Sequence, residues 1–244
     1  MLKNRKNFSF LNYVWYKILH RRTVKACKDL ITVSKFSRKE IAQYYNINEE
    51  SIHVTYNGWQ HINNVKEDKE ILKKIKEITK ENKYFFSMGT LTKHKNMRWV
   101  IETAKNNPNY IFLISGFKNS EKVYKKIGIE STENVKYLGY LNDEEMKTVI
   151  KNAEALLYPT LYEGFGIPPL EAMAVNTKVI VSNIPAIREI YGDTVYYINP
   201  YDPKVNLEEI LKGKVKDSNT TLDKYSWEKS ARDLLNILNK YIEK

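Results

Sequence analysis

The stretch YPTLYEGFGIPPLEAMAV, Tyr158–Val175, joins the end of an apolar strand to the start of a helix through a glycine-rich turn. Gly164 and Gly166 let the backbone turn sharply and let a ligand approach it closely. The helix begins near Ile167, because proline is tolerated in a first helical turn. The unpaired N–H groups and partial positive charge of a helix start favour an anion, and a diphosphate fits such a site well.

Two carboxylates, Glu163 and Glu171, lie on either side of this turn. Glu171, about one turn into the helix, can accept hydrogen bonds from the two hydroxyls of a vicinal diol such as a ribose. Glu163 can hold hydroxyls of the group that follows the diphosphate. The order diol, diphosphate, polyol describes a nucleotide sugar. The alternative is that both side chains merely serve the helix dipole and solvent, and the spacing alone leaves it open.

Outward from this stretch, near-continuous apolar strands alternate with helical patterns. Strands are expected at 84–89, 110–116, 135–139, 154–159, 178–183 and 194–200. Helices are expected at 96–106, 120–128, 142–153, 167–175 and 184–192. This alternation predicts an α/β fold, a Rossmann-like doubly wound parallel sheet covered on both faces. Its ligands should bind at the carboxyl ends of the strands.

Further elements flank the sheet. A strand (29–34), a helix (35–47), a β-branched strand (51–58) and a charged helix (67–83) come before it. After it, Ser226 is expected to cap a C-terminal helix. We therefore divide the chain into an N-terminal segment (1–54), a Rossmann-like domain (55–222) and a terminal helix (223–244).

Composition limits the protein class. The chain has 244 residues, 42% of them hydrophobic, enough for a large packed domain. Cys27 is the only cysteine, so no internal disulfide can form. No apolar run reaches the roughly 18–20 residues of a membrane span, and the N-terminus lacks the apolar core of a secretory signal. We expect a cytoplasmic protein.

The net charge of +11 is uneven. Residues 1–28 hold eight basic side chains and no acidic one, with Phe8, Leu11, Trp15, Ile18 and Leu19 at helical spacing. Such a basic amphipathic helix can lie on the anionic inner face of a cell membrane, or it can pack on a neighbouring domain. Nucleic-acid binding is disfavoured, because no RNA-type aromatic motif is present and the charge is diffuse beyond residue 28.

Several sequence motifs are absent. The chain has no Asp-x-Asp, no phosphate-binding Walker A sequence and no Gly-x-Gly-x-x-Gly. These absences disfavour a metal-dependent transferase, an ATPase and an NAD enzyme.

The segment EGFGIPPLE resembles the E-x7-E motif of glycosyltransferase family 4, the retaining, metal-independent enzymes of the GT-B fold. Other segments resemble that family in the same order: DLITVSKFSRKEI with IHVTYNG, FFSMGTLTKHKNM, VKYLGYLNDEEM, IPAIREIYGD with VYYINPYDP, and SWEKSA. The resemblance runs from about Asp29 to the end. It implies the C-terminal, donor-binding half of a GT-B enzyme, with flanking N- and C-terminal helices.

The resemblance also implies roles for particular residues. Glu171 should bind the donor ribose, while Glu163 should touch the transferred sugar and, with Lys95, form the catalytic group. Lys95 should pair with the diphosphate, with no metal or cofactor required. The donor site should be completed, partly through backbone groups, by Gly89, Thr90, Gly116, Gly139, Tyr140, Leu141, Gly164, Phe165, Gly166 and Ile167.

The sequence departs from the family pattern at one place. The family often has arginine directly after the glycine of the first phosphate loop, where this chain has Thr90. A subset instead has arginine just before the lysine, where this chain has His94. The second cation is therefore His94, a neighbouring lysine such as Lys93, or absent.

The resemblance covers only the second of the two domains of a GT-B enzyme. Sugar transfer to a glycan or lipid-linked acceptor, as in bacterial surface polysaccharide assembly, would then need an acceptor domain. The terminal helices should pack on each other or leave an apolar patch, which favours a homodimer or a complex with a separate acceptor-domain subunit. A non-catalytic donor-binding subunit is the alternative function.

Overall fold

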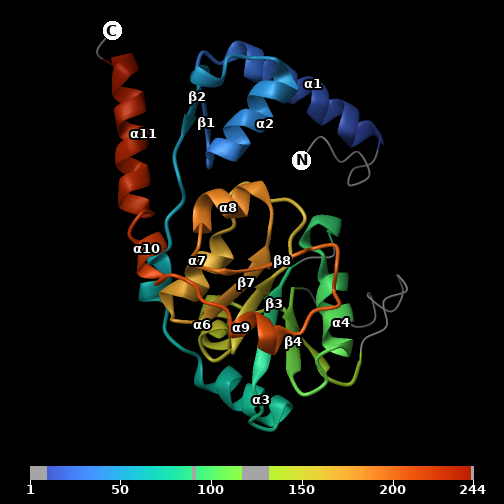
Figure 1. Ribbon diagram of the computed structural model, residues 1–244. Helices are drawn as coiled ribbons and strands as arrows, with labels where there is room; N and C mark the ends of the chain where they lie inside the picture. Colours follow the sequence, from blue (N-terminus) through green and yellow to red (C-terminus); the bar gives the residue numbers. More distant parts are fainter. Residues whose placement is uncertain (1–9, 90–91, 117–131, 243–244) are drawn as a thin grey trace.

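The computed structural model describes residues 10–89, 92–116 and 132–242. A twisted parallel sheet lies at its centre (Figure 1). Within the described residues this sheet has six strands in the order β5-β4-β3-β6-β7-β8, and every neighbouring pair is parallel. The strands are β3 (Tyr84–Met88), β4 (Ile111–Ser115), β5 (Val135–Gly139), β6 (Ala155–Tyr158), β7 (Lys178–Ser182) and β8 (Tyr196–Ile198). The predicted α/β fold with a parallel sheet is confirmed.

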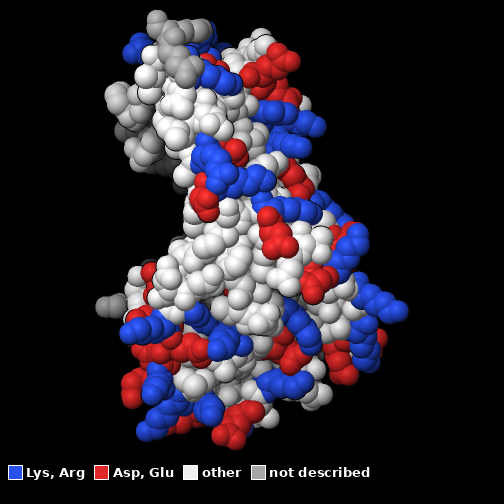
Figure 2. Space-filling model, turned by 90° about the vertical axis from the view of Figure 1, so that its left-hand side faces the viewer, with Lys and Arg blue, Asp and Glu red and all other residues white. Residues whose placement is uncertain are grey.

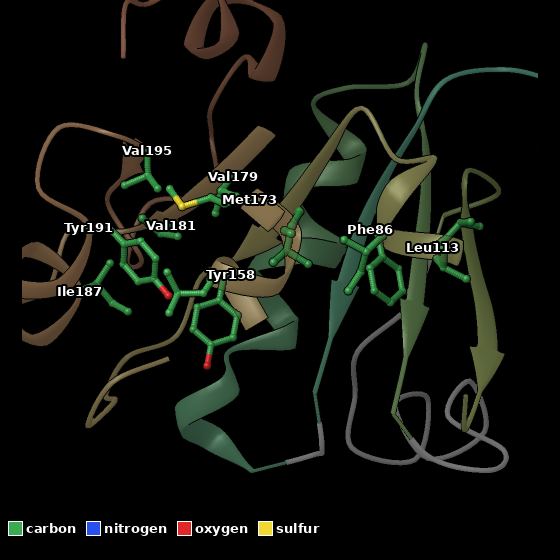
Figure 3. Close-up of a cluster of buried hydrophobic side chains, with 14 of the residues drawn as sticks. Phe86, Leu113, Tyr158, Met173, Val179, Val181, Ile187, Tyr191 and Val195 are labelled. Atoms are coloured by element: carbon green, nitrogen blue, oxygen red, sulfur yellow. The ribbon is translucent and has the colours of Figure 1, made fainter. Parts of the chain in front are cut away.

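Both faces of the sheet are buried, as the unbroken apolar strands predicted. Phe85 and Phe86 are fully buried and point to opposite faces, because side chains alternate along a strand. One face is covered by α3 (Lys69–Thr79), α6 (Asp143–Lys151), α7 (Ile167–Ala174) and α8 (Pro185–Tyr191), and part of this core is drawn in Figure 3. The other face is covered by α4 (Met97–Lys105) and α9 (Leu207–Leu211).

The strand order reverses direction between β3 and β6. From β3 the chain adds β4 and then β5 on one side, and it returns to place β6, β7 and β8 on the other. In open α/β sheets the crevice at such a switch point, beyond the carboxyl ends of the strands, is where ligands bind. The loops that follow β3 and β6 therefore mark the expected site.

A smaller lobe precedes this domain. Its strands β1 (Leu30–Thr32) and β2 (Ile52–Val54) pair in parallel as a separate two-stranded sheet. The lobe also contains α1 (Phe10–Ala26), α2 (Lys35–Tyr45) and the short helix η2 (Glu49–Ser51). In Figure 1 it lies above the carboxyl-end side of the large sheet, next to α8. The domain boundaries drawn from the sequence stay a prediction.

Glu189 on α8 fixes this lobe to the large domain. Its two carboxylate oxygens accept hydrogen bonds from the backbone N–H groups of Lys35 (2.8 Å) and Phe36 (2.7 Å) at the start of α2. The hydroxyl of Tyr56 donates a third bond at 3.2 Å, and burial together with Glu189 raises the pKa of Tyr56 to about 12. A carboxylate is favourable there because a helix start carries partial positive charge.

Two chain segments lie against each other beside the lobes: residues 55–60, which follow β2, and residues 225–230, which lead into the C-terminal helix. We call these segments the two crossings. A Cβ on Gly58 would lie 2.2 Å from the backbone nitrogen of Trp227, so only glycine allows this approach. Gln60 binds the second crossing through its amide group: its oxygen accepts from the Trp227 N–H at 3.0 Å, and its nitrogen donates to the Tyr225 carbonyl at 3.0 Å. The short helices η3 (Gln60–Asn64) and α10 (Asn219–Leu222) flank this junction.

The terminal helices do not pack on each other. Figure 1 shows α11 (Trp227–Ile242) and α1 well apart. Apolar side chains on both are exposed, namely Val14, Trp15, Tyr16, Ile18, Leu19, Trp227, Leu234, Leu235, Leu238, Tyr241 and Ile242. None of the described helices has both the length and the apolarity needed to cross a membrane.

Most predicted elements occur where the sequence placed them. Asn142 caps α6, and a reciprocal bond from Glu145 completes a capping box. The predicted helix at 120–128 lies outside the described residues. The sequence reading missed the short helices η2, η3, α9, α10 and η4 (Lys93–Lys95), because elements of three to five residues have too little periodicity to detect.

Replacing Glu189 by glutamine should destabilise the fold. The amide keeps one acceptor but turns its N–H₂ group toward the second helical N–H, so one buried contact is lost. We expect a loss of about 1–3 kcal/mol in the free energy of unfolding, measured by urea denaturation. The control is Glu77→Gln, which changes an exposed carboxylate on α3 and should have almost no effect. Equal losses in both variants would contradict this role of Glu189.

Candidate functional site

Gly166 makes the turn from β6 into α7. Its φ is +86°, a left-handed conformation that L side chains rarely adopt, and it caps the start of the helix. A Cβ at this position would lie 3.0 Å from Cδ1 of Ile187 and 3.3 Å from the ring of Tyr158. The buried hydroxyl of Tyr191 donates to the Gly166 carbonyl. Figure 3 shows Tyr158 and Tyr191 near each other in the core.

The start of α7 offers only a few backbone donors. Pro168 and Pro169 have no N–H, so the groups that remain nearest the turn are those of Phe165, Gly166 and Ile167. No described residue accepts a hydrogen bond from these three. The Phe165 side chain itself is buried and packs on two tyrosines, so Phe165 can contribute to a ligand only through its backbone.

Lys95, Glu163 and Tyr158 form a hydrogen-bonded cluster at the carboxyl ends of β3 and β6. The Lys95 ammonium lies 2.8 Å from Oε1 of Glu163 and 3.3 Å from the Tyr158 hydroxyl. The Tyr158 hydroxyl donates to the same Glu163 oxygen at 2.8 Å. Lys95 lies in η4 after β3, Tyr158 ends β6 and Glu163 follows it, so the cluster joins the two sides of the switch point. The family resemblance implied that Lys95 pairs with the diphosphate of the donor. In the structure, Lys95 forms an ion pair with Glu163.

Tyr158 remains protonated in this cluster. Burial, followed by the charge of Glu163 and the hydrogen bond to it, raises the Tyr158 pKa well above its ordinary value. Burial likewise raises the pKa of Tyr191. The charges of Glu163 and Glu171 both contribute to the two shifts. Tyr158 therefore acts as a donor that orients Glu163.

A cavity of about 230 Å³ opens beside the cluster. Its lining comes from the ends of β3, β4 and β5 and from the starts of α6 and α7. The lining residues are Met88, Gly89, Lys95, Ser115, Gly116, Tyr140, Leu141, Met146, Tyr158 and Pro168. Five of them were predicted from the sequence, namely Gly89, Lys95, Gly116, Tyr140 and Leu141. The cavity lies at the carboxyl ends of the strands, where ligands bind in such sheets, and its wall is mainly apolar.

Backbone constraints explain Gly116 in this wall and Gly139 beside it. A Cβ on Gly116 would lie 2.0 Å from the carbonyl oxygen of Gly89, so β3 and β4 can meet there only without a side chain. Gly139 has φ +78°, which lets the chain leave β5 and turn toward the cavity. Beyond it Tyr140 is 72% exposed and Leu141 is buried. Thr90, the remaining predicted residue of this loop, lies outside the described residues.

The structure reduces the candidates for a second cation beside Lys95, which were His94 and Lys93. His94 is half-buried in the short helix η4, where burial and then the charge of Lys95 lower its pKa. A histidine whose pKa is below its ordinary value is neutral at pH 7, so His94 adds no positive charge. Lys93 is exposed in the same turn.

Glu171 lies outside the lining of the cavity and has partners that the sequence did not indicate. Nε2 of His61 lies 2.8 Å from Oε1 of Glu171, and Nδ1 of His61 lies 2.9 Å from Nε1 of Trp227. Tyr158 could have been noticed, since it ends the strand before the turn. His61 and Trp227 are 110 and 56 residues away along the chain, so no local pattern could pair them with Glu171.

Other ligand types have less support from the side chains. Within the ranges that the structure covers, no three His, Cys, Asp or Glu side chains gather as metal ligands. On the face seen in Figure 2, basic and acidic side chains are interspersed and form no single basic stripe.

The family of the chain follows from comparison with known proteins. The family model described as "Glycosyl transferases group 1" matches residues 68–233, which include every residue of the cavity wall and the turn at Gly166. The chain belongs to the group 1 glycosyl transferases. The match also covers Lys95, Glu163 and Glu171.

Two relatives of the chain are named as O-antigen chain mannosyltransferases. The O-antigen chain mannosyltransferase RfbU of Salmonella typhimurium is 35% identical over 200 residues, which are 80% of this chain and 54% of the relative. The O-antigen chain mannosyltransferase B of Escherichia coli is 28% identical over 211 residues, 83% of this chain and 55% of the relative. The chain thus spans about half the length of these relatives.

Solved structures share the fold at low sequence identity. Sucrose-phosphate synthase from Thermosynechococcus elongatus superposes with a TM-score of 0.76 at 14% identity, covering 99% of this chain and 65% of the other. Anabaena HepE, in a complex with UDP and glucose, gives a TM-score of 0.68 at 18% identity, covering 88% and 64%. These likenesses establish only the fold of the chain.

Replacing Gly166 by alanine should strain the turn and crowd its neighbours. A non-glycine residue at this φ costs about 1–3 kcal/mol, and the contact with Ile187 adds to that. The matched control is Gly192→Ala, because Gly192 also has a positive φ, +50°, but open space around a Cβ. We expect the larger loss of unfolding free energy for Gly166→Ala in urea denaturation. Equal losses would show that packing at the turn is unimportant.

Proposed function

We propose that this chain binds a nucleotide-diphosphate sugar and provides the donor half of a retaining, metal-independent family 4 transferase. The observation that carries the proposal is the Lys95–Glu163–Tyr158 cluster at the switch point, next to the unpaired N–H groups of α7. A cation and a helix start together favour a diphosphate. A carboxylate held beside them favours sugar hydroxyls.

In the proposed mechanism the bond between C1 of the sugar and the diphosphate oxygen breaks while an acceptor hydroxyl attacks C1 from the same face, and the hydroxyl proton passes to the departing diphosphate oxygen. Negative charge then grows on the leaving diphosphate. Lys95 and the N–H groups of Gly166 and Ile167 stabilise it from fixed positions, without an added metal ion. Glu163, oriented by Tyr158, holds a hydroxyl of the transferred sugar.

The ion pair between Lys95 and Glu163 keeps both side chains in place before the donor binds. The two groups are largely shielded from solvent, with side-chain exposures of 23% and 14%. A diphosphate that approaches Lys95 would share the ammonium with Glu163, since an ammonium has three donors. Lys95, which lines the cavity, would then bind the phosphate, and Glu163, which precedes the Gly166 turn, would bind the sugar.

Glu171 is proposed to bind the ribose. It lies on α7 beyond the phosphate-binding turn, and its Oε2 accepts no hydrogen bond from any residue that the structure describes. A carboxylate can accept from both hydroxyls of a vicinal diol. This order along α7 supports the nucleotide-sugar assignment made from the sequence.

The relatives suggest which sugar to test first. Two of them are named as O-antigen chain mannosyltransferases, so we propose mannose as the transferred sugar and surface polysaccharide synthesis as the pathway. The acceptor is then a glycan or a lipid-linked glycan. The base of the nucleotide is left to experiment, because Gly139 and Leu141 offer only backbone and shape.

The acceptor is proposed to bind to a further domain or subunit. The chain covers about half of its relatives, apolar side chains of α1 and α11 are exposed, and the β1–β2 sheet has no third strand in the described chain. A homodimer, a separate acceptor-domain subunit or the rest of a longer chain would each cover these surfaces. A non-catalytic donor-binding subunit is the second candidate function, and the same exposed surfaces favour it.

Peripheral binding to the cytoplasmic face of a membrane is proposed for the basic N-terminal segment. Within it, α1 combines Lys17, Arg21, Arg22 and Lys25 with exposed Trp15 and other apolar residues. Anionic lipid attracts such a segment at about 1 kcal/mol per basic residue near the surface. Lipid-linked acceptors lie at that surface.

A thermal-shift panel with UDP, GDP, dTDP and ADP in the absence of metal tests the proposed donor site. We expect a ribonucleotide to raise the free energy of unfolding by about 2.7 kcal/mol at a hundredfold excess over its Kd. The base that works identifies the nucleotide. Stabilisation by none of the four would contradict an intact donor site in this chain, and stabilisation by dTDP alone would contradict the role given to Glu171.

Replacing Lys95 by methionine should weaken the binding of the diphosphate. Loss of a charged hydrogen bond worth about 1.5–3 kcal/mol should lower the affinity for the nucleoside diphosphate at least tenfold in calorimetry. The affinity for the corresponding nucleoside, which has no phosphate, should not change. The control is Lys93→Met in the same turn, and a similar loss there would show that only net charge matters.

A further inference from the structure

We propose that His61 is a positioning residue for Glu171, and that Trp227, the first residue of α11, sets the state of His61. This rests on the proposed function, in which Glu171 binds the ribose. The carboxylate, the imidazole and the indole form one chain of hydrogen bonds. Nε2 of His61 lies 2.8 Å from Oε1 of Glu171, and Nε1 of Trp227 lies 2.9 Å from Nδ1 of His61.

The indole determines the tautomer of the histidine. An indole N–H can only donate a hydrogen bond, so Nδ1 of His61 must accept it and carries no proton. A neutral imidazole has one protonated nitrogen, which is then Nε2. This N–H points at Glu171 and donates to it. The Trp227 contact thus gives His61 the only neutral form that can hold the carboxylate.

The neutral form preserves the charge of the carboxylate. A protonated His61 would neutralise Glu171, and its Nδ1–H would face the indole N–H of Trp227. A neutral donor fixes Oε1 and leaves the negative charge available for a ligand. Oε2, with no partner in the described chain, remains directed by the same bond. Glu171 is also the less exposed partner, at 18% against 43% for His61.

The position of His61 is itself fixed by the two chain crossings. Gln60, its neighbour, is hydrogen-bonded to Trp227 and Tyr225, and the close approach at Gly58 holds the two crossings together. His61 belongs to η3, which packs against α7. The two crossings therefore fix the imidazole of His61, and the imidazole in turn orients the carboxylate of Glu171. A glutamate with three free torsions would otherwise sample several orientations.

The tautomer is tested in the intact 244-residue chain without nucleotide. Nitrogen-15 NMR of the histidine rings should show His61 with an unprotonated Nδ1 and a protonated Nε2. Replacing Trp227 by phenylalanine keeps an aromatic ring but removes the N–H, so this preference for one tautomer should be lost. A wild-type His61 with a protonated Nδ1 would overturn the inference, whatever the protein binds.

The positioning role is tested by ribose discrimination. UDP and GDP are each compared with their 2′-deoxy counterparts by calorimetry, for the wild type and for Glu171→Gln, His61→Phe, His61→Gln and Trp227→Phe. We expect His61→Phe and Trp227→Phe to lower the ribonucleotide affinity roughly tenfold, with little change for the deoxy form. His61→Gln, which retains an amide donor near Nε2, should recover part of the discrimination.

The outcomes separate this inference from the proposed function. If Glu171→Gln leaves the ratio of ribo to deoxy affinity unchanged, the ribose role of Glu171 is wrong. If Glu171→Gln abolishes the ratio but His61→Phe does not, the proposed function stands and the positioning role is wrong. Equal weakening of both nucleotides by His61→Phe would indicate a merely structural role. His53→Phe is the matched control, because His53 also pairs with a carboxylate, Asp29, at 2.8 Å and lies in the small lobe.

Discussion

The left-handed turn at Gly166 is the constraint on which the site depends. It ends the loop after β6 and starts α7 at the switch point of the sheet, and the hydroxyl of Tyr191 donates to its carbonyl. The same turn places Glu163 on its near side, within reach of Lys95, and the free N–H groups of the helix on its far side. A larger residue would be strained at this φ, and Ile187 and Tyr158 would have to shift, because a Cβ would lie 3.0 Å and 3.3 Å from them.

A second constraint joins the two lobes. Glu189 accepts two N–H groups of α2, and the Ser37 hydroxyl of that helix reaches the carbonyl of Gly164 in the turn at 3.5 Å. On the helix side of the turn, Trp227 is linked to Glu171 by the two hydrogen bonds of His61. Both ends of the site loop are thus tied to segments outside the large sheet.

The sequence predicted the sheet well because its strands are buried on both faces, and such strands form recognisable apolar runs. The turn with Gly164 and Gly166 was also predictable, since glycines permit a sharp turn and the two prolines that follow fix φ for the start of a helix. Tyr158, His61 and Glu189 were not identified as site or joining residues. Their partners lie in other elements, and only the order of strands and the two chain crossings bring them together. The pairing of Lys95 with Glu163 depends on the same strand order.

The most direct test of the account is a crystal structure of this chain with the nucleoside diphosphate that stabilises it. We predict that the diphosphate lies within hydrogen-bonding distance of Lys95 and of the N–H groups of Gly166 and Ile167, with both ribose hydroxyls on Glu171. The base should fill the cavity between Gly116 and Leu141. A nucleotide bound away from the β3–β6 switch point, or one whose ribose faces solvent, would contradict the account.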